Sequence, residues 1–297
     1  MASLKEIKGR INSVKSTGKI TSAMKMIASS KLHKAQLAIK NMLPYERLLM
    51  QIMGNFLSSE TSVQSPYITE RPVRRVALVI FSSNSSLCGG FNATVIKELQ
   101  AFLRDYASLG TNAVDIYPVG KKVGKAVEKA GFTPKGDYSD MAEHPSFKSA
   151  SALAAEVMKS FTDGEVDKVE MVYFHFKSTA TQSLTRKIYL PIQLDEFKTV
   201  APDTNTDSKK GEWEKDYIVE PSRSEVLTSL LPQALHLEVF TALLDSNASE
   251  HAARTMAMQT ATDNTNDLLQ DLTLMYNKSR QQAITNELLD IVAGSMK

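Results

Sequence analysis

The residues of this sequence that could do chemistry lie mainly in one serine- and glycine-rich stretch. Residues 82–92, SSNSSLCGGFN, follow a short apolar run and precede a helical pattern, which is where parallel α/β sheets bind their ligands. The stretch has neither the G-x-G-x-x-G spacing of dinucleotide binders nor the Lys-Ser/Thr pair of a phosphate-binding loop. Gly89 and Gly90 therefore favour a tight strand-to-helix turn over a nucleotide site, and Cys88 favours a buried structural thiol over a nucleophile.

The other polar side chains do not have the spacing of a catalytic or metal site. The five histidines are scattered, and none stands three or four residues from another histidine or from the cysteine, so no metal site is predicted. Asp263, Asp267 and Asp271 are four residues apart, which places three like charges on one helix face. They would repel one another unless water or a partner's basic groups accommodate them. The residues thus give no catalytic constellation, and no cofactor is predicted.

The elements that must hold these residues are dominated by one long C-terminal stretch. Residues 233–293 contain neither glycine nor proline, the two residues that most reliably end a helix. One helix of this length would span roughly 90 Å at about 1.5 Å per residue. A compact chain of about 300 residues has a radius of gyration of only about 19 Å. The helix is therefore expected to protrude from its own domain or to run the length of a larger assembly.

The N-terminal residues, up to about residue 57, have the pattern of a second long helix. Twelve positions recur at alternating steps of three and four, the a/d seam of a coiled coil, although three of them, Gly18, Thr21 and Lys25, form a weak patch. The other nine are Leu4, Ile7, Ile11, Val14, Ala28, Leu32, Ala35, Ile39 and Met42. The partner helix has the small residues Ala248, Ala252, Ala253, Ala257 and Ala261 in its middle, which let two backbones approach closely.

The charges of the two helices are opposite. Up to residue 50 there are ten basic and two acidic residues, a net charge of +8, and from residue 225 onward nine acidic and four basic residues give −5. Part of this opposition is expected to be satisfied between the helices, although exposed pairs contribute only about 0–1 kcal/mol each. The remaining positive charge is either a solvated face or a surface left for a partner.

Between the helices the pattern changes to strands that alternate with helices, which argues for βαβ units and a small, largely parallel sheet. Strands are expected at 74–81, 114–119, 168–177 and 183–194, helices at 91–107, 120–131 and 147–161 with Ser146 as a cap, and a polar loop at 201–216.

Composition limits the class of protein. The 297 residues are 42% apolar and 23% charged with a formal net charge of +2, as in ordinary globular domains. A single cysteine excludes an internal disulfide framework and suits a reducing compartment. No apolar run approaches the roughly 20 residues of a membrane span, and the first residues lack a signal-peptide core. We therefore expect a protein made and used on the cytoplasmic side.

Three segments resemble the γ subunits of rotary F-type ATP synthases, in that family's order and spacing across nearly the whole chain. They are residues 20–36 (ITSAMKMIASSKLHKAQ), residues 82–92 and residues 250–292, of which the last is the most specific. The resemblance implies a non-catalytic rotor shaft, with the terminal helices as an antiparallel coiled coil inside the α3β3 hexamer. It also implies that a Rossmann-like domain lies beside ε and the membrane ring of c subunits.

Together, the patterns and the resemblance predict an α/β protein in three parts. An N-terminal coiled-coil helix is expected over residues 1–58, a Rossmann-like α/β domain over 59–205, and a C-terminal helix that pairs with the first over 206–297. By the family's motifs, Met24, Lys25, Arg280 and Gln281 would contact β. The apolar residues Ile284, Leu288, Ile291 and Val292 would lie in a bearing at the top of the hexamer.

The resemblance also implies the setting of the protein. One copy per complex is expected at the cytoplasmic face of a bacterial inner membrane, attached indirectly through the F0 sector, with β, ε and the c ring as partners and no nucleic acid. Two departures from the family pattern stand out: Asn84-Ser85-Ser86 replaces Asp-Arg-Gly, and Gly294-Ser295 replaces Gly-Ala. The cysteine pair of light-regulated chloroplast members is absent.

The residues alone leave two other functions open. The βαβ centre is also typical of an α/β enzyme with a coiled-coil arm. The basic N-terminal helix is also typical of a coiled-coil nucleic-acid binder, although it lacks the interleaved aromatic residues that stack on bases.

Overall fold

The computed structural model describes residues 3–59, 65–193, 219–220 and 222–295, so the loop predicted at 201–216 lies outside the described residues. Both predicted long helices are present. Helix α1 covers Leu4–Ser59 and helix α7 covers Arg223–Ser295, a stretch of 73 residues that corresponds to roughly 110 Å of helix.

Helix α7 begins ten residues before the glycine- and proline-free stretch, because it continues through Pro232. A proline inside a helix removes one backbone hydrogen bond. Here the residues on both sides of it, Leu231 and Ala234, are buried in the core and hold the helix in place. One window of α7 is apolar enough by composition to cross a membrane, although the sequence was expected to contain none. However, 44% of that window is buried inside the chain, as in a helix that belongs to a protein core.

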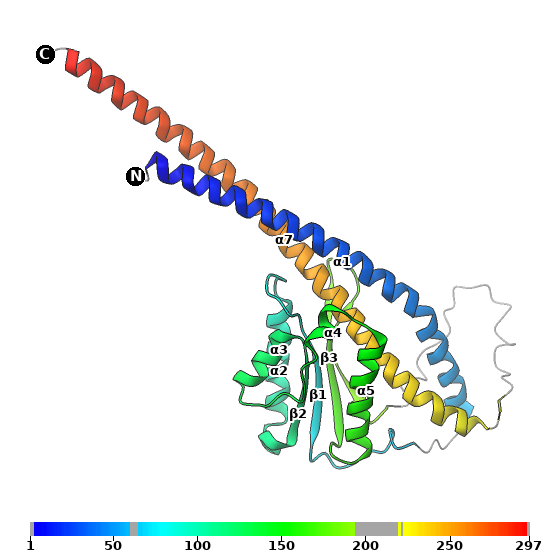
Figure 1. Cartoon of the computed structure of the whole chain (residues 1–297). Coiled ribbons are helices and arrows are strands. Elements are labelled where there is room, and N and C mark those ends of the chain that lie inside the picture. Colours follow the sequence, from blue (N-terminus) through cyan, green and yellow to red (C-terminus); the bar gives the residue numbers. More distant parts are fainter. Residues whose placement is uncertain (1–2, 60–64, 194–218, 221, 296–297) are drawn as a thin grey trace, which may run out of the picture. The chain divides into compact units, whose positions relative to one another are not determined.

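The central segment forms a sheet of four strands in the order β2-β1-β3-β4 (Figure 1). Strand β1 (Val76–Phe81) is parallel to both β2 (Val114–Val119) and β3 (Lys168–Phe176). Strand β4 (Gln182–Leu190) is antiparallel to β3. The prediction of a small, largely parallel sheet is confirmed.

Helices connect and cover these strands: α2 (Phe91–Asp105), α3 (Lys121–Lys129), α4 (Ser139–Glu143) and α5 (Phe147–Thr162). Short 3-10 turns lie at Ala107–Leu109 and Thr111–Ala113. The predicted cap is confirmed, since Ser149 N donates a hydrogen bond to Ser146 Oγ at 3.2 Å. Helix α4, five residues long, was not predicted because it is shorter than the 11–18 residues over which helical periodicity can be recognised in a sequence.

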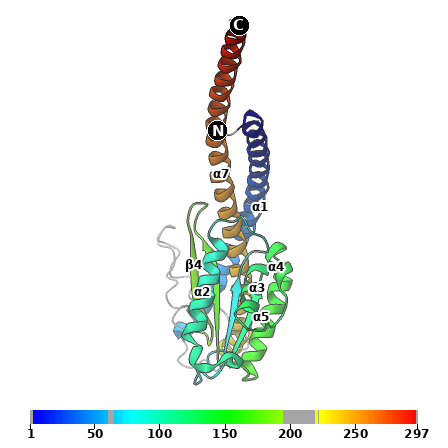
Figure 2. The same cartoon turned by 90° about the vertical axis from the view of Figure 1, so that its left-hand side faces the viewer.

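Each face of the sheet has its own hydrophobic core, because successive side chains of a strand point to opposite faces. Val76, Leu78 and Ile80 pack with residues of α2 and α3. Ala77, Val79 and Phe81 pack with residues of α5 and α7 and with the end of α1. Figure 2 shows α2 and α5 on opposite sides of the sheet.

The described chain divides into two compact units, and the division passes through both long helices. We call residues 31–253 the sheet unit, and residues 1–30 with 254–297 the helix-pair unit. The predicted domain boundaries at 58/59 and 205/206 stay a prediction.

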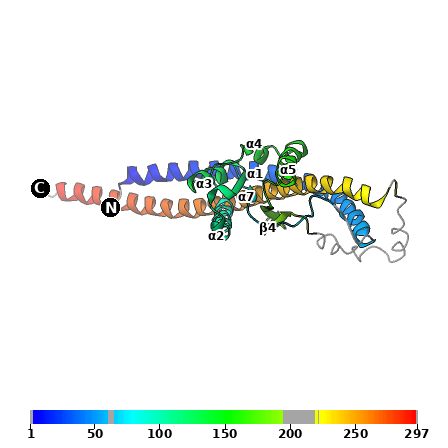
Figure 3. The ribbon, with the colours of Figure 1, turned by 90° about the horizontal axis from the view of Figure 1, so that it is seen from below.

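In the helix-pair unit α1 and α7 run antiparallel, as Figure 3 shows. Thr21 bonds Thr262, and Gly18 lies against Thr265, so each step along α1 is matched by a reverse step along α7. All twelve predicted seam positions of α1 are buried or half-buried. The a/d pattern therefore identified the packed face of α1 correctly.

The described part of the helix-pair unit does not contain the expected charge pairing between the helices. Among the described residues, none of the six basic side chains of α1 in this unit forms an ion pair with an acid of α7. They are Lys5, Lys8, Arg10, Lys15, Lys19 and Lys25. Most of them are exposed on the outer faces of α1, whereas the seam that contacts α7 is apolar or hydroxylated. The opposite net charges of the two helices are thus not neutralised within this unit.

In the sheet unit one carboxyl group is poorly accommodated. Glu46 of α1 is half-buried and has no hydrogen bond or ion pair with any described residue. Burial raises the pKa of Glu46 above the usual value, and the nearby carboxylates Asp245 and Glu238 raise it further. Lys187 and His175 lower this pKa, but by less than the other effects raise it. Both acids belong to α7 and have their own partners, since Asp245 pairs with His175 at 2.5 Å and Glu238 pairs with Lys187.

We expect Glu46→Gln to stabilise the chain. Because the folded-state pKa is raised, the ionised carboxyl destabilises the fold fully above that pKa and not at all below the unfolded-state pKa. The midpoint of thermal unfolding should rise by roughly 2–4 °C at about pH 8, and the difference from the unsubstituted chain should vanish near about pH 4. Thermal melts across pH would measure this. The exposed Glu128→Gln serves as the control, and an equal gain there, or a gain that persists at low pH, would contradict the explanation.

Candidate functional site

The candidate site at the carboxyl end of β1 is a loop closed by its own side chains. Ser83 N donates to Asn92 Oδ1 at 3.2 Å, and Asn92 Nδ2 donates to the Ser85 carbonyl at 3.3 Å. Cys88 is 1% exposed and lies 3.1 Å from Asn92 Nδ2, which confirms the buried thiol. The departure at Asn84 has a local role, because its amide donates to the Ser139 carbonyl at 2.8 Å.

The neighbouring helix N-terminus is already bonded to this loop. At the start of α3, Lys121 N donates to Asn84 Oδ1 and Val123 N donates to Ser82 Oγ, at 3.0 and 3.1 Å. Lys122 N donates to the Ser83 carbonyl. A phosphate-binding helix needs these N–H groups to point at the ligand. These backbone N–H groups are therefore not free to bind an anion in the surface hollow of about 410 Å³ beside Lys121 and Lys125.

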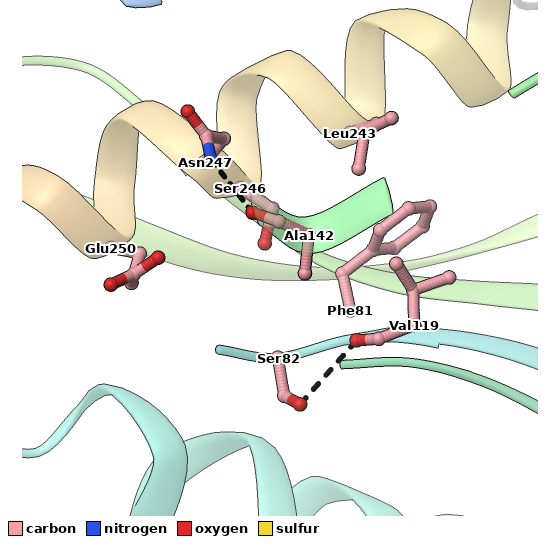
Figure 4. A pocket seen from close by; sticks show the side chains of 8 residues that line it. All are labelled: Phe81, Ser82, Val119, Ala142, Leu243, Ser246, Asn247 and Glu250. Atoms are coloured by element: carbon pink, nitrogen blue, oxygen red, sulfur yellow. Dashed lines mark hydrogen bonds between the residues drawn. The ribbon is translucent and has the colours of Figure 1, made fainter. Parts of the chain in front are cut away.

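Helix α7 occupies the space above the strand ends (Figure 4). Leu243, Ser246, Asn247 and Glu250 of α7 face Phe81, Ser82 and Val119 of the sheet, and Asn247 Nδ2 donates to the Ala142 carbonyl at 2.9 Å. The cavity left between them measures about 10 Å³, which holds about one water molecule. Ligand pockets measure about 300–1,000 Å³. The position at which such folds bind nucleotides is thus filled by the chain's own helix.

The other candidate groups also serve the structure. His175, one of the five scattered histidines, pairs with Asp245 of α7. Among the described residues no cluster of histidine, cysteine and carboxylate side chains could hold a metal ion. Asp263, Asp267 and Asp271 are all exposed, and Gln259 donates to Asp263 at 2.8 Å, so water and one amide accommodate them.

The structure separates the residues for which the resemblance implied a β contact. Met24 and Lys25 are half-buried on α1, whereas Arg280 and Gln281 are exposed on α7. The antiparallel register places Met24 opposite Gln259, about 21 residues or roughly 30 Å along α7 from Arg280. These residues form two separate surfaces of the helix pair.

The last turns of α7 have no partner within the described chain. Ala283 is the last half-buried residue, and every residue from Ile284 to Ser295 is exposed. Figure 2 shows α7 continuing past the first residue of α1. The four predicted bearing residues are 47–67% exposed and lie on one face of the helix. They are Ile284, Leu288, Ile291 and Val292.

Comparison with known proteins agrees with this arrangement. The family model described as ATP synthase matches residues 3–296. The ATP synthase gamma chain of Phocaeicola vulgatus is 61% identical over the full length of both chains, and that of Parabacteroides distasonis is 48% identical over 99% of each. The chain belongs to the ATP synthase gamma-chain family.

Solved structures share the gamma-chain fold. A chain of the mitochondrial ATP synthase of Euglena gracilis (OSCP/F1/c-ring) matches 99% of this chain over 93% of its own length, with a TM-score of 0.65 and 20% identity. A chain of the central stalk and c-ring structure from Tetrahymena thermophila covers 82% of this chain with 99% of its own length. Its TM-score is 0.57 and its sequence identity is 24%. Gamma chains are central-stalk subunits that do not catalyse by themselves, and the two alternative functions are therefore set aside.

Sequence reasoning missed two features of this gamma chain. One is that α7 fills the space above the carboxyl ends of the strands. The signal in the sequence was the polar stretch from Asp245 to Glu250 within a mainly apolar segment, and the structure buries all six of these residues. The other is Gly120, which has φ +105 and would place a Cβ 2.3 Å from the Ser82 carbonyl oxygen. Gly90, by contrast, has φ −81, and a Cβ added there would meet only Thr94 Oγ1, at 4.0 Å.

We expect Gly120→Ala to destabilise the sheet unit by about 3 kcal/mol or more, because it combines left-handed backbone strain with a backbone clash. Gly90→Ala should change stability by less than about 1 kcal/mol. Urea unfolding of both variants would measure the difference. Equal stability would contradict the assignment of Gly120, rather than Gly90, as the structurally required glycine.

Proposed function

We propose that this gamma chain is the rotating shaft of a bacterial ATP synthase. Ion flow turns the ring of c subunits, the ring turns the shaft, and the shaft drives the β catalytic sites of the α3β3 hexamer through binding, synthesis and release of ATP. Family membership supports the proposal, as do solved neighbours described as a central stalk with a c-ring and as F1 with a c-ring.

The observation that carries the proposal is the unpartnered end of α7. A stretch of twelve exposed residues with four apolar side chains on one face does not stay bare in a working protein, because exposed apolar patches of this kind mark contact surfaces. We infer that Ile284, Leu288, Ile291 and Val292 turn inside an apolar bearing of the hexamer. Such a bearing needs shape complementarity without directional bonds, which would resist rotation.

Two polar surfaces are proposed to contact β. One includes Met24 and Lys25 of α1, where Lys25 forms no ion pair with an acid of α7 among the described residues. The other includes Arg280 and Gln281, both exposed. A guanidinium can make two parallel bonds to a carboxylate, and such a pair is both strong and geometrically selective. Contacts at two heights transmit torque better than one, because they resist tilting of the shaft.

The remaining parts of the proposal concern the setting. One copy is expected per complex, in contact with β, ε and the c ring, and held to the membrane only through the F0 sector. The expected location is the cytoplasmic face of a bacterial inner membrane. The Phocaeicola and Parabacteroides relatives are bacterial proteins and are named as gamma chains of this complex.

Replacing Arg280 and Gln281 together by alanine should lower ion-driven ATP synthesis about tenfold, which corresponds to about 1.4 kcal/mol of lost contact energy. The purified chain should melt at an unchanged temperature, because both side chains are exposed. Synthesis in membrane vesicles and thermal melts of the free chain would measure the two effects. Asn277→Ala with Lys278→Ala is the matched control, and unchanged synthesis in the Arg280/Gln281 variant would show that these contacts are dispensable.

Truncation before Ile284 should leave the melting temperature of the free chain within about 2 °C, since the described residues that it removes are all exposed. Truncation before Glu250 should expose the seam of α1 and lower the melting temperature by more than about 10 °C or prevent folding. Both truncated complexes would be assayed for synthesis. A larger loss of activity from the shorter truncation would contradict the proposed division of roles.

A further inference from the structure

The weak patch of the α1 seam is a close contact between the two helices. A Cβ on Gly18 would lie 2.8 Å from Thr265 Cγ2, closer than such atoms approach in proteins. Thr265 is 8% exposed, and its hydroxyl donates to the Ala261 carbonyl at 2.7 Å, which turns its methyl group toward α1. The two backbones therefore approach at Gly18 more closely than any larger residue would allow.

A chain of hydroxyl groups lies one helical turn away. Thr21 Oγ1 and Thr262 Oγ1 are 2.9 Å apart, Thr21 Oγ1 is 3.1 Å from the Gly18 carbonyl, and Thr262 Oγ1 is 2.8 Å from the Met258 carbonyl. Two protons serve these three contacts, and a carbonyl oxygen only accepts, so when one threonine donates to the other, the accepting threonine donates to the carbonyl of its own helix. In either arrangement one hydrogen bond joins a side chain of α1 to a side chain of α7.

The rest of the α1 seam in the helix-pair unit is only partly buried. On α1 only Ile7 and Ala28 are buried, while Leu4, Ile11 and Val14 stay half-exposed. An apolar seam between two helices in water resists separation, but it has no directional bond against sliding. The close contact and the hydroxyl chain supply both a steric stop and a directional bond.

We propose that Gly18, Thr21, Thr262 and Thr265 form a clamp that makes the two helices turn as one torsion-bearing rod. Twisting a pair of helices makes them slide along each other unless they are fixed together, and the clamp opposes that sliding. The four are positioning residues. They act on torque only through Arg280 and the end of α7, so their role in torque rests on the proposed function. The existence of the clamp does not depend on that function.

The chain contains a matched control for this proposal. Gly9 lies in the same helix, and a Cβ added there would have nothing within 4 Å, so Gly9→Ala and Gly9→Leu add bulk where there is room. Gly18→Ala and Gly18→Leu add the same bulk against Thr265. In the rescue variant, Gly18→Ala is combined with Thr265→Ser, which removes the clashing methyl group and keeps the hydroxyl that bonds Ala261.

The first measurement uses the full-length free chain. Spin labels are attached at Lys8→Cys and Met275→Cys, two exposed positions that lie opposite each other in the antiparallel register. The labels report the distance between the two helices. The native Cys88 is buried and does not take up a label. Gly18→Leu should broaden the distance distribution at least about twofold, and amide exchange over residues 4–17 should quicken at least about tenfold. Gly9→Leu should do neither, and the rescue variant should keep both at the values of the unsubstituted chain.

The second measurement uses the assembled enzyme in membrane vesicles. Gly18→Leu should lower ion-driven ATP synthesis at least about threefold with the complex intact, Gly18→Ala should lower it less, and the rescue variant should recover it. An unchanged distance distribution and exchange rate in Gly18→Leu would overturn the clamp. Loosened helices with full synthesis would overturn its role in torque. If complexes with the unsubstituted chain made no ATP, the proposed function would fail while the free-chain measurement would still decide the clamp.

Discussion

The structure depends on one constraint: a helix satisfies its own backbone hydrogen bonds, but its apolar side chains need a partner. Helix α7 meets this constraint in three ways along its length. From Leu227 to Ala253 it is a core helix of the sheet unit, and from Arg254 to Ala283 it keeps only a seam against α1. From Ile284 onward it has no partner in the described chain. The helix is therefore stable where it is held, and we propose that its exposed end is covered by other subunits.

The same helix explains why a nucleotide-binding type of fold has no active site here. The sheet has the strand order and the loop positions from which such folds bind ligands, but α7 crosses that edge and leaves a cavity of about 10 Å³. The donors at the start of α3 are bonded to Ser82 and Asn84 instead of a phosphate. The fold thus serves as a scaffold that anchors two long helices, which illustrates that a fold does not imply a function.

Electrostatics sets the remaining surface properties. In the helix-pair unit the described bases of α1 form no ion pair with α7, and most of them are exposed, so this part of α1 keeps a positively charged surface. In the sheet unit, Glu46 lies near two α7 carboxylates that already have partners, and burial raises its pKa. That contact weakens rather than strengthens the attachment of α1, whereas the apolar residues Leu49 and Met53 hold it.

The sequence by itself determined the elements: the a/d spacing located the packed face of α1, the absence of glycine and proline after Pro232 indicated α7, and alternation of strands and helices indicated the parallel sheet. These are local patterns, which depend on period and propensity within one segment. Tertiary structure alone decided which segments meet. Nothing local pairs Gly18 with Thr265, places Glu250 over Ser82, or makes Gly120 rather than Gly90 the required glycine, because each depends on atoms that lie far apart in sequence and are brought together only by packing.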